Sequence, residues 1–311
     1  MTSSTTHELK KESLMSHNLR GVLTALSTPF NQDETIDVDT LRRIVDRSID
    51  AGVDGVVAAG STGEVGALSS EERLLPIETV IKQANGRVPV IANTGATSTA
   101  EAIRLSQAAE KLGADVLMLV TPYYEPLSLE ETVTYIKDVA NSVKIPVMLY
   151  NIPAVTGVNL DPTTVRALAE EVDNIRYIKD SSANWEQALQ LIHHHSDVIG
   201  TFIGWDVYLY SALVEGAAGV MAGTANVVPN EIVAVSRAIA EGDLAGALEQ
   251  WRRVYPVIDA LLSVPFIPAI KTGLTLQGLR AGSPRRPTAD LSAEDQARVQ
   301  QALSALYQTV A

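Results

Sequence analysis

The sequence predicts a (β/α)8 barrel, the TIM barrel fold, followed by a C-terminal helical segment. The first observation is a series of eight short apolar runs whose ends lie about 18 to 33 residues apart, which is the length of one strand plus one helix. The second is that helical patterns lie between the runs, and that no further strand pattern follows Asn230. A doubly wound open sheet is the alternative, but the G-x-G-x-x-G fingerprint of a dinucleotide fold is missing after the first run.

Each predicted strand is a short run of mainly apolar residues, as expected for strands buried on both faces. In order, the runs are Gly21–Leu26, Gly55–Ala59, Val88–Ala92, Val116–Val120, Pro146–Tyr150, Ile175–Lys179, Val198–Ile203 and Gly219–Met221. The predicted helices include Val38–Ala51, Ser70–Ala84, Thr99–Leu112, Leu129–Ser142 and Pro162–Glu171. Good N-cap residues precede or open four of them, namely Asp37, Ser70, Ser128 and Asp161, and glycines 52, 86 and 113 mark stops.

The chain divides into three predicted parts. Residues 1–17 are polar and lack the apolar core of a signal peptide, so we expect a mobile N-terminal tail. Residues 18–240 carry the eight strand and helix units. Residues 241–311 read as successive helices, with breaks expected at Gly242, Pro256, Pro265 and the loop around Pro284.

Composition excludes several classes of function. A net charge of -13 over 311 residues argues against nucleic-acid partners and anionic membranes. No apolar stretch reaches the ~18–20 residues of a membrane span. The chain has no cysteine, which excludes disulfides, thiolate zinc sites and cysteine nucleophiles and fits a cytoplasmic protein. His193, His194 and His195 are consecutive, so on a helix they diverge; a solvated helix end is expected there, and no metal site is predicted.

Lys179 ends the apolar run Ile175–Lys179. A buried ammonium is costly unless it is paired or loses its proton. One interpretation is structural: the amine pairs with Asp180 or extends outward to water. The other is chemical, because a desolvated lysine amine that has lost its proton attacks carbonyl carbons and forms a Schiff base.

Other polar residues follow the ends of neighbouring strands, where barrel enzymes place their chemistry. The segment Gly60–Glu64 follows the second strand, Thr121–Tyr124 follows the fourth, and Tyr150 ends the fifth. Taken singly, the glycine-rich loop could be a simple turn and the tyrosines could be packing residues. Taken together with Lys179, these segments bring hydroxyls, backbone N–H groups suited to a carboxylate, and one amine to the same rim.

Four motifs carry a resemblance to a known family. They are GSTGE at 60–64, VTPYY at 120–124, YNIPAVTG at 150–157 and YIKDSS at 177–182. In this order and spacing, the chain resembles the dihydrodipicolinate synthase / N-acetylneuraminate lyase family of pyruvate-dependent class I aldolases, from about Gly21 to Pro287. The resemblance implies a lyase that needs no metal or organic cofactor beyond a covalent imine, and a homotetramer built as a dimer of dimers.

The resemblance also implies roles for individual residues. Lys179 is similar to the Schiff-base lysine that captures the keto carbon of pyruvate or another 2-oxo acid. Tyr150 is similar to the general acid/base that moves protons on the adduct. The remaining implied positions are Ser61 and Thr62, which hold the substrate carboxylate and link Tyr150 into a proton relay, Gly63 beside them, and Tyr124, which reaches into a neighbouring subunit's site.

The distal half of the substrate is less defined. The resemblance implies that bacterial dihydrodipicolinate synthases carry an arginine at the place of Val155, where it binds the carboxylate of aspartate semialdehyde. An apolar side chain cannot replace that contact. Gly204-Trp205-Asp206 resembles the sugar-binding segment of sialic acid lyases, although Asp206 could equally cap the following helix. Asp180 and Thr224 are further candidates for the outer pocket.

These features predict an N-acetylneuraminate lyase-like aldolase that forms or cleaves a C–C bond in a sugar acid or a hydroxy-oxo acid. The alternative is a dihydrodipicolinate synthase that condenses pyruvate with aspartate semialdehyde. A decarboxylating or dehydrating variant is third, since the same imine supports those eliminations. A non-catalytic barrel that binds a 2-oxo acid is a fourth hypothesis, which an intact Lys179 and Tyr150 disfavour.

Overall fold

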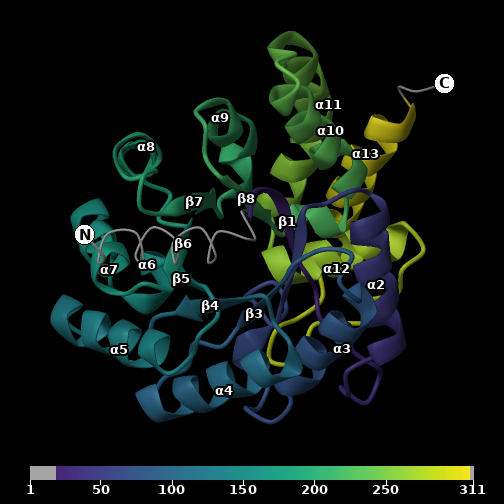
Figure 1. Cartoon of the computed structure of the whole chain (residues 1–311). Helices are drawn as coiled ribbons and strands as arrows, with labels where there is room; N and C mark the ends of the chain where they lie inside the picture. The colour runs from purple at the N-terminus through teal and green to yellow at the C-terminus, as the bar shows by residue number, and fades with distance from the viewer. Residues whose placement is uncertain (1–18, 309–311) are drawn as a thin grey trace.

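Eight parallel strands close into a barrel in which each strand pairs with its neighbours in sequence and β8 pairs with β1 (Figure 1). This computed structural model describes residues 19–308, so the predicted tail at 1–17 lies outside the described residues. The barrel confirms the predicted fold. Its strands are β1 (Gly21–Ala25), β2 (Gly55–Ala58), β3 (Val90–Asn93), β4 (Val116–Val120), β5 (Val147–Asn151), β6 (Ile175–Asp180), β7 (Gly200–Ile203) and β8 (Gly219–Ala222).

The barrel interior is filled by alternate residues of the strands, because successive side chains of a strand point to opposite faces. Met118, Met148, Phe202 and Met221 belong to this interior cluster and are almost completely buried. The intervening residues pack against the surrounding helices in a second, larger cluster. Gly219 leaves room for the ring of Phe202, since a Cβ there would lie 2.5 Å from it.

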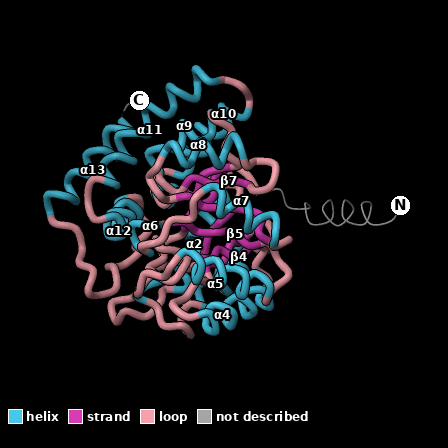
Figure 2. Tube along the Cα trace, turned by 90° about the vertical axis from the view of Figure 1, so that its left-hand side faces the viewer, coloured by secondary structure: helices cyan, strands magenta, loops and turns pink. Residues whose placement is uncertain are grey.

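Helices ring the barrel on its outside, as Figures 1 and 2 show. They are α2 (Val38–Asp50), α3 (Leu74–Ala84), α4 (Thr99–Leu112), α5 (Leu129–Asn141), the short α6 (Pro153–Thr156), α7 (Pro162–Glu171), α8 (Trp185–His194), α9 (Leu209–Val214) and α10 (Pro229–Ala240). Asp37, Ser128 and Asp161 cap their helices as predicted. Ser70 does not cap α3: Ser69 and Glu72 bond each other's backbone N–H groups in a preceding turn, and the regular helix begins only at Leu74.

Three helices follow the barrel: α11 (Leu244–Leu262), α12 (Phe266–Leu276) and α13 (Ala293–Gln308). No strand follows β8 in residues 19–308, as predicted. Gly242 and Pro265 separate helices, but the predicted break at Pro256 is wrong, because this proline lies inside α11. Its side chain is exposed, so the carbonyl that loses its N–H partner is on the solvent side, while a buried stripe from Val254 to Leu261 holds the helix in place.

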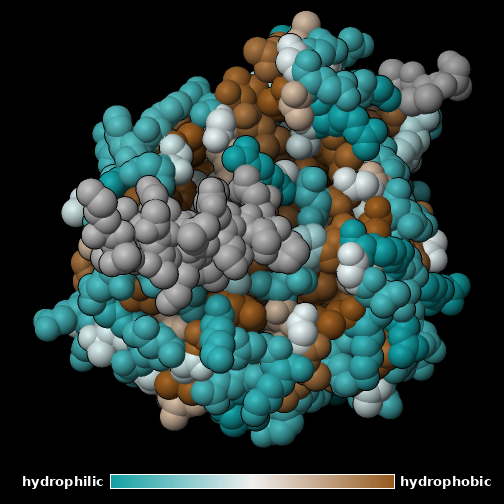
Figure 3. All heavy atoms as spheres, in the orientation of Figure 1, coloured by the Kyte–Doolittle hydropathy of each residue, from teal (hydrophilic) through white to brown (hydrophobic). Residues whose placement is uncertain are grey.

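Most of the face shown in Figure 3 is hydrophilic, with apolar residues gathered at the top, around α10 and α11. Within residues 19–308, no helix combines the length and the apolar character needed to cross a membrane.

Candidate active site

Lys179 and Tyr150 lie side by side at the carboxyl ends of β6 and β5, where the two residues are paired in register. Nζ of Lys179 lies 4.1 Å from the centroid of the Tyr150 ring. Lys179 is 6% exposed and Tyr150 is 2% exposed, so the amine does not extend outward to water. Gly204 makes room for the lysine, since a Cβ there would lie 2.4 Å from its Cε.

Asp180 faces away from this pair. Its carboxylate accepts hydrogen bonds from Asn151 Nδ2 at 2.9 Å, Ser182 Oγ at 2.9 Å and Gln187 Nε2 at 3.3 Å. Burial raises its pKa above the ordinary range, although these hydrogen bonds oppose the effect. The structure therefore corrects two sequence hypotheses. Asp180 is neither the partner of Lys179 nor a residue of the barrel mouth, because neighbouring residues of a strand point to opposite faces.

The loop after β2 approaches Tyr150 from the opposite side of the mouth. Ser61 Oγ and the Tyr150 hydroxyl share a hydrogen bond of 3.4 Å. Burial by itself would raise the pKa of Tyr150, but the charge of Lys179 and the contacts with Ser61, Lys179 and Ser181 outweigh it and leave the pKa below its ordinary value. Ser61 is exposed, whereas Thr62 beneath it is buried.

Two further predicted site residues, Asp206 and Thr224, lie together after the ends of β7 and β8. The Asp206 carboxylate accepts hydrogen bonds from the Thr224 backbone N–H at 2.8 Å and from its hydroxyl at 2.7 Å. Burial raises the pKa of Asp206, while Thr224 and the charge of Lys179 oppose the rise. The helix-cap interpretation of Asp206 is wrong, because the residue lies inside the short 3-10 helix Asp206–Tyr208 and its side chain bonds to Thr224 instead.

The sequence that folds into this barrel matches a family model. The model of the Dihydrodipicolinate synthetase family matches residues 18–306. The chain belongs to the dihydrodipicolinate synthetase family. Family membership confirms the predicted lyase of the class I aldolase type.

Relatives of this family resemble the chain over nearly its whole length. The 4-hydroxy-tetrahydrodipicolinate synthase of Oceanobacillus iheyensis is 38% identical, and the match covers 92% of this chain and 97% of the relative. Among solved structures, the Acinetobacter baumannii dihydrodipicolinate synthase complexed with pyruvate is 33% identical with a TM-score of 0.89, covering 93% and 99% of the two chains. The family protein YagE of E. coli K12, in complex with pyruvate, is 32% identical with a TM-score of 0.88, covering 93% and 98%.

Two of the predicted family residues lie on the surface. Tyr124, in the loop after β4, is 81% exposed, which excludes the interpretation of this tyrosine as a core aromatic within its own chain. Val155, on α6 after β5, is 57% exposed. A role for Tyr124 in a neighbouring subunit and a role for Val155 in choosing the substrate stay predictions.

The histidines of α8 are placed as expected for a helix end. His193 Nε2 lies 3.1 Å from Glu215 Oε2, and both side chains are about half exposed. Among the described residues, no group of three or more acidic, histidine or cysteine side chains could hold a metal ion.

Sequence reasoning missed one buried ion pair of this family member, between Glu64 of the GSTGE motif and Lys271 of α12. Nζ of Lys271 lies 2.9 Å from Glu64 Oε1, and each side chain is 2% exposed. A signal was present, since Lys271 is the only charged residue in the otherwise apolar or uncharged segment Phe266–Leu276.

Proposed function

We propose that the chain forms an imine between Lys179 and the keto carbon of pyruvate, and uses this imine to form or break a C–C bond. The observation that carries the proposal is the buried Lys179 amine beside the Tyr150 ring, with the Tyr150 hydroxyl linked to Ser61 at the carboxyl end of the barrel. The two family members with bound pyruvate support pyruvate as the first substrate.

The chemistry follows from the positions of the groups. The unprotonated amine of Lys179 attacks the keto carbon, and loss of water leaves the imine. The imine withdraws electrons, so a proton leaves the adjacent methyl carbon and the resulting enamine attacks an aldehyde; cleavage reverses these steps. Tyr150 is the group placed to transfer protons to and from the departing hydroxyl. No step requires a metal or an organic cofactor.

The carboxylate of pyruvate would lie against the loop after β2. Ser61 offers an exposed hydroxyl, Thr62 offers a second one, and Gly63 allows a close approach of the backbone. Asp206 and Thr224 would line the part of the pocket that takes the second substrate. Tyr124 would complete the site of a neighbouring subunit in a cytoplasmic homotetramer.

Two acceptors have separate support. Val155, in place of an arginine, favours a sugar acid or another hydroxy-oxo acid, because an apolar residue offers no partner to a second carboxylate. The name of the Oceanobacillus iheyensis relative favours aspartate semialdehyde, the acceptor of the synthase alternative. Turnover assays with both classes of acceptor separate them.

Trapping with borohydride tests the central claim. Incubation with pyruvate and borohydride, followed by intact mass and peptide mapping, should give a pyruvate-sized adduct on Lys179 that is absent in Lys179→Ala. A control aldolase under the same conditions verifies the trapping. If the control forms its adduct and this chain does not, the imine is excluded and the non-catalytic binding barrel is favoured.

A further inference from the structure

We propose that Lys271 and Arg285, two residues of the C-terminal segment, position the loop Ser61–Gly63 for the carboxylate of the imine-forming substrate. Neither residue faces the reacting atoms, so both are positioning residues. The inference rests on the proposed function of that loop. It is carried by a chain of contacts, buried at Lys271 and partly buried at Arg285, that leads from the loop to residues more than 200 positions later in the sequence.

Glu64 is the first step of this chain. Its backbone has φ +60°, a left-handed conformation that is unusual for a residue with a side chain. It directly follows Gly63, whose carbonyl accepts a 2.7 Å hydrogen bond from Thr28 Oγ1. A residue held in this conformation fixes the direction of the chain beside it, so whatever holds the Glu64 side chain also sets the direction of the loop Ser61–Gly63.

Lys271 holds the loop in two ways. Its ammonium forms the buried ion pair with Glu64 and also donates to the backbone carbonyl of Thr28 at 2.7 Å. The same Thr28 donates its side-chain hydroxyl to Gly63. Burial lowers the pKa of Lys271, and Glu64 opposes this decrease. The Lys271 ammonium therefore contacts both Glu64, which follows the loop, and Thr28, whose hydroxyl binds the loop at Gly63.

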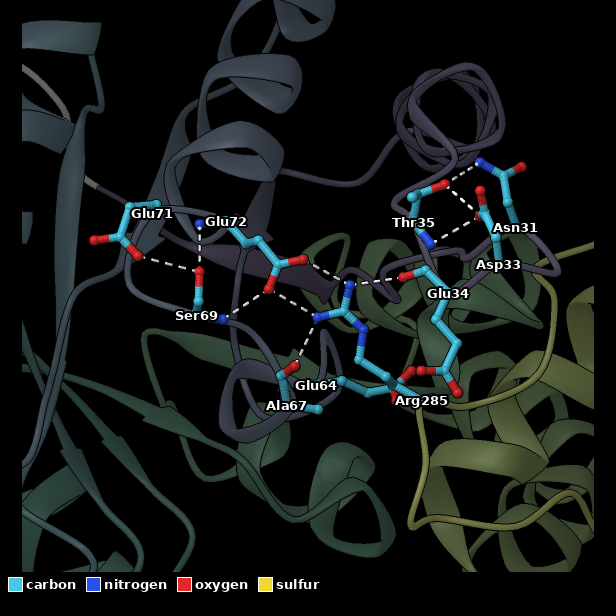
Figure 4. Close-up of polar contacts among 10 residues, drawn as sticks. All are labelled: Asn31, Asp33, Glu34, Thr35, Glu64, Ala67, Ser69, Glu71, Glu72 and Arg285. Carbon is cyan, nitrogen blue, oxygen red and sulfur yellow. Dashed lines mark hydrogen bonds and ion pairs between the residues drawn. The ribbon is translucent and has the colours of Figure 1, made fainter.

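Arg285 binds the second carboxylate oxygen of Glu64, and it also binds the segment that follows Glu64 in the sequence (Figure 4). Its backbone N–H donates to Glu64 Oε2 at 2.9 Å. Its guanidinium donates to the carbonyls of Ala67 and Glu34, each at 2.7 Å, and to both carboxylate oxygens of Glu72 at 2.9 and 2.8 Å. The loop after β2 is thereby joined on its outer side to the loop after β1.

A buried ion pair is weak evidence for stability, since an apolar pair of the same volume often serves as well. Its value here is geometric. Removal of Lys271 leaves the Glu64 carboxylate buried without its cation, so the loop has to shift, and a displacement of about 1 Å at a substrate-positioning group can cost about a hundredfold in rate.

The test compares Lys271→Met with the wild-type enzyme. We expect kcat/KM for pyruvate to fall by roughly tenfold or more, chiefly through a higher KM for pyruvate, while borohydride trapping at saturating pyruvate is retained. Lys137→Met is the matched control, because it removes a lysine from the ion pair with Glu171 between outer helices. A folded Lys271→Met enzyme with an unchanged KM for pyruvate overturns the proposal. Absence of an adduct in the wild type refutes the proposed function instead.

A second pair of variants keeps the proposal testable if Lys271→Met does not fold. Arg285→Gln removes the guanidinium contacts but keeps the backbone N–H bond to Glu64, and it should raise the KM for pyruvate, with partial rescue in Arg285→Lys. The Glu64→Gln background should reduce the effect of Lys271→Met, since no buried carboxylate is then left alone. An unchanged KM for pyruvate in Arg285→Gln contradicts the inference.

Discussion

Tyr150 shows how the properties of a buried tyrosine depend on its immediate neighbours. Burial disfavours a tyrosinate, yet the charge of Lys179 and the hydrogen bond with Ser61 stabilise it. A tyrosine whose pKa lies below its ordinary value of about 10 exchanges protons more readily at neutral pH. Ser61 thus contacts Tyr150, in addition to the role toward the substrate carboxylate that we propose for it.

Ser61→Ala should shift the alkaline limb of the pH profile of kcat to higher pH. The hydroxyl of Ser61 lowers the pKa of Tyr150, so its removal raises that pKa and keeps the phenol protonated further into the alkaline range. The KM for pyruvate should also rise. The measurement is kcat between pH 6 and about 10 at saturating substrate. A limb that does not move means that another group sets it.

Val155→Arg should raise kcat/KM for condensation with aspartate semialdehyde by about tenfold to a hundredfold, because a charge-assisted contact to a carboxylate contributes ~1.5–3 kcal/mol. Val155 is more than half exposed, so the longer side chain fits without disturbing the core. Val155→Met is the control for size without charge. Equal rates for both variants would show that other loops select the acceptor.

The site was predictable from sequence where motif and strand end coincide, as for Lys179, Tyr150 and Ser61, which the structure brings together. The prediction that Asp180 lies beside Lys179 in the pocket was wrong, because side chains alternate along a strand and Asp180 therefore faces away from Lys179. Lys271 stood out as a lone charge in an apolar segment, but its partner Glu64 could not be derived from sequence, since the two lie on segments that only the folded chain brings together.

At the level of elements, α5 begins with a complete capping box. Ser128 accepts from the backbone N–H of Glu131, and the Glu131 side chain accepts from the backbone of Ser128. Ser128→Ala should lower the free energy of unfolding by about 1 kcal/mol, measured by urea denaturation. Ser98→Ala, which removes the single 3.4 Å cap bond of α4, should cost less. A larger loss at Ser98 would contradict this ranking of the caps.

Strand positions were predicted to within two residues at each end, because each run is short and mainly apolar. Helix ends were predicted where a side chain caps the helix, as at Asp37 and Asp161. The start of α3 and the continuity of α11 through Pro256 depend on tertiary contacts and on solvent access, which local patterns do not contain.

At the level of the whole molecule, the exposed Tyr124 carries the prediction about assembly. Tyr124→Phe should lower kcat severalfold while the tetramer stays intact, because only the hydroxyl that would complete the site of a neighbouring subunit is lost. Sedimentation velocity gives the assembly state and steady-state kinetics gives the rate. Loss of the tetramer would show that Tyr124 is a packing residue of the interface. A monomer in the wild type would refute the proposed shared site.

The long-range contacts of the loop after β2 can form only late in the synthesis of the chain. A ribosome releases Ser61, Tyr150 and Lys179 well before it reaches Lys271 and Arg285, which lie in and beyond α12. A nascent chain therefore carries Lys179 before it carries the residues that contact Glu64. Fragments that end before α12 lack these contacts altogether, so Glu64 is held by both partners only in the nearly finished chain.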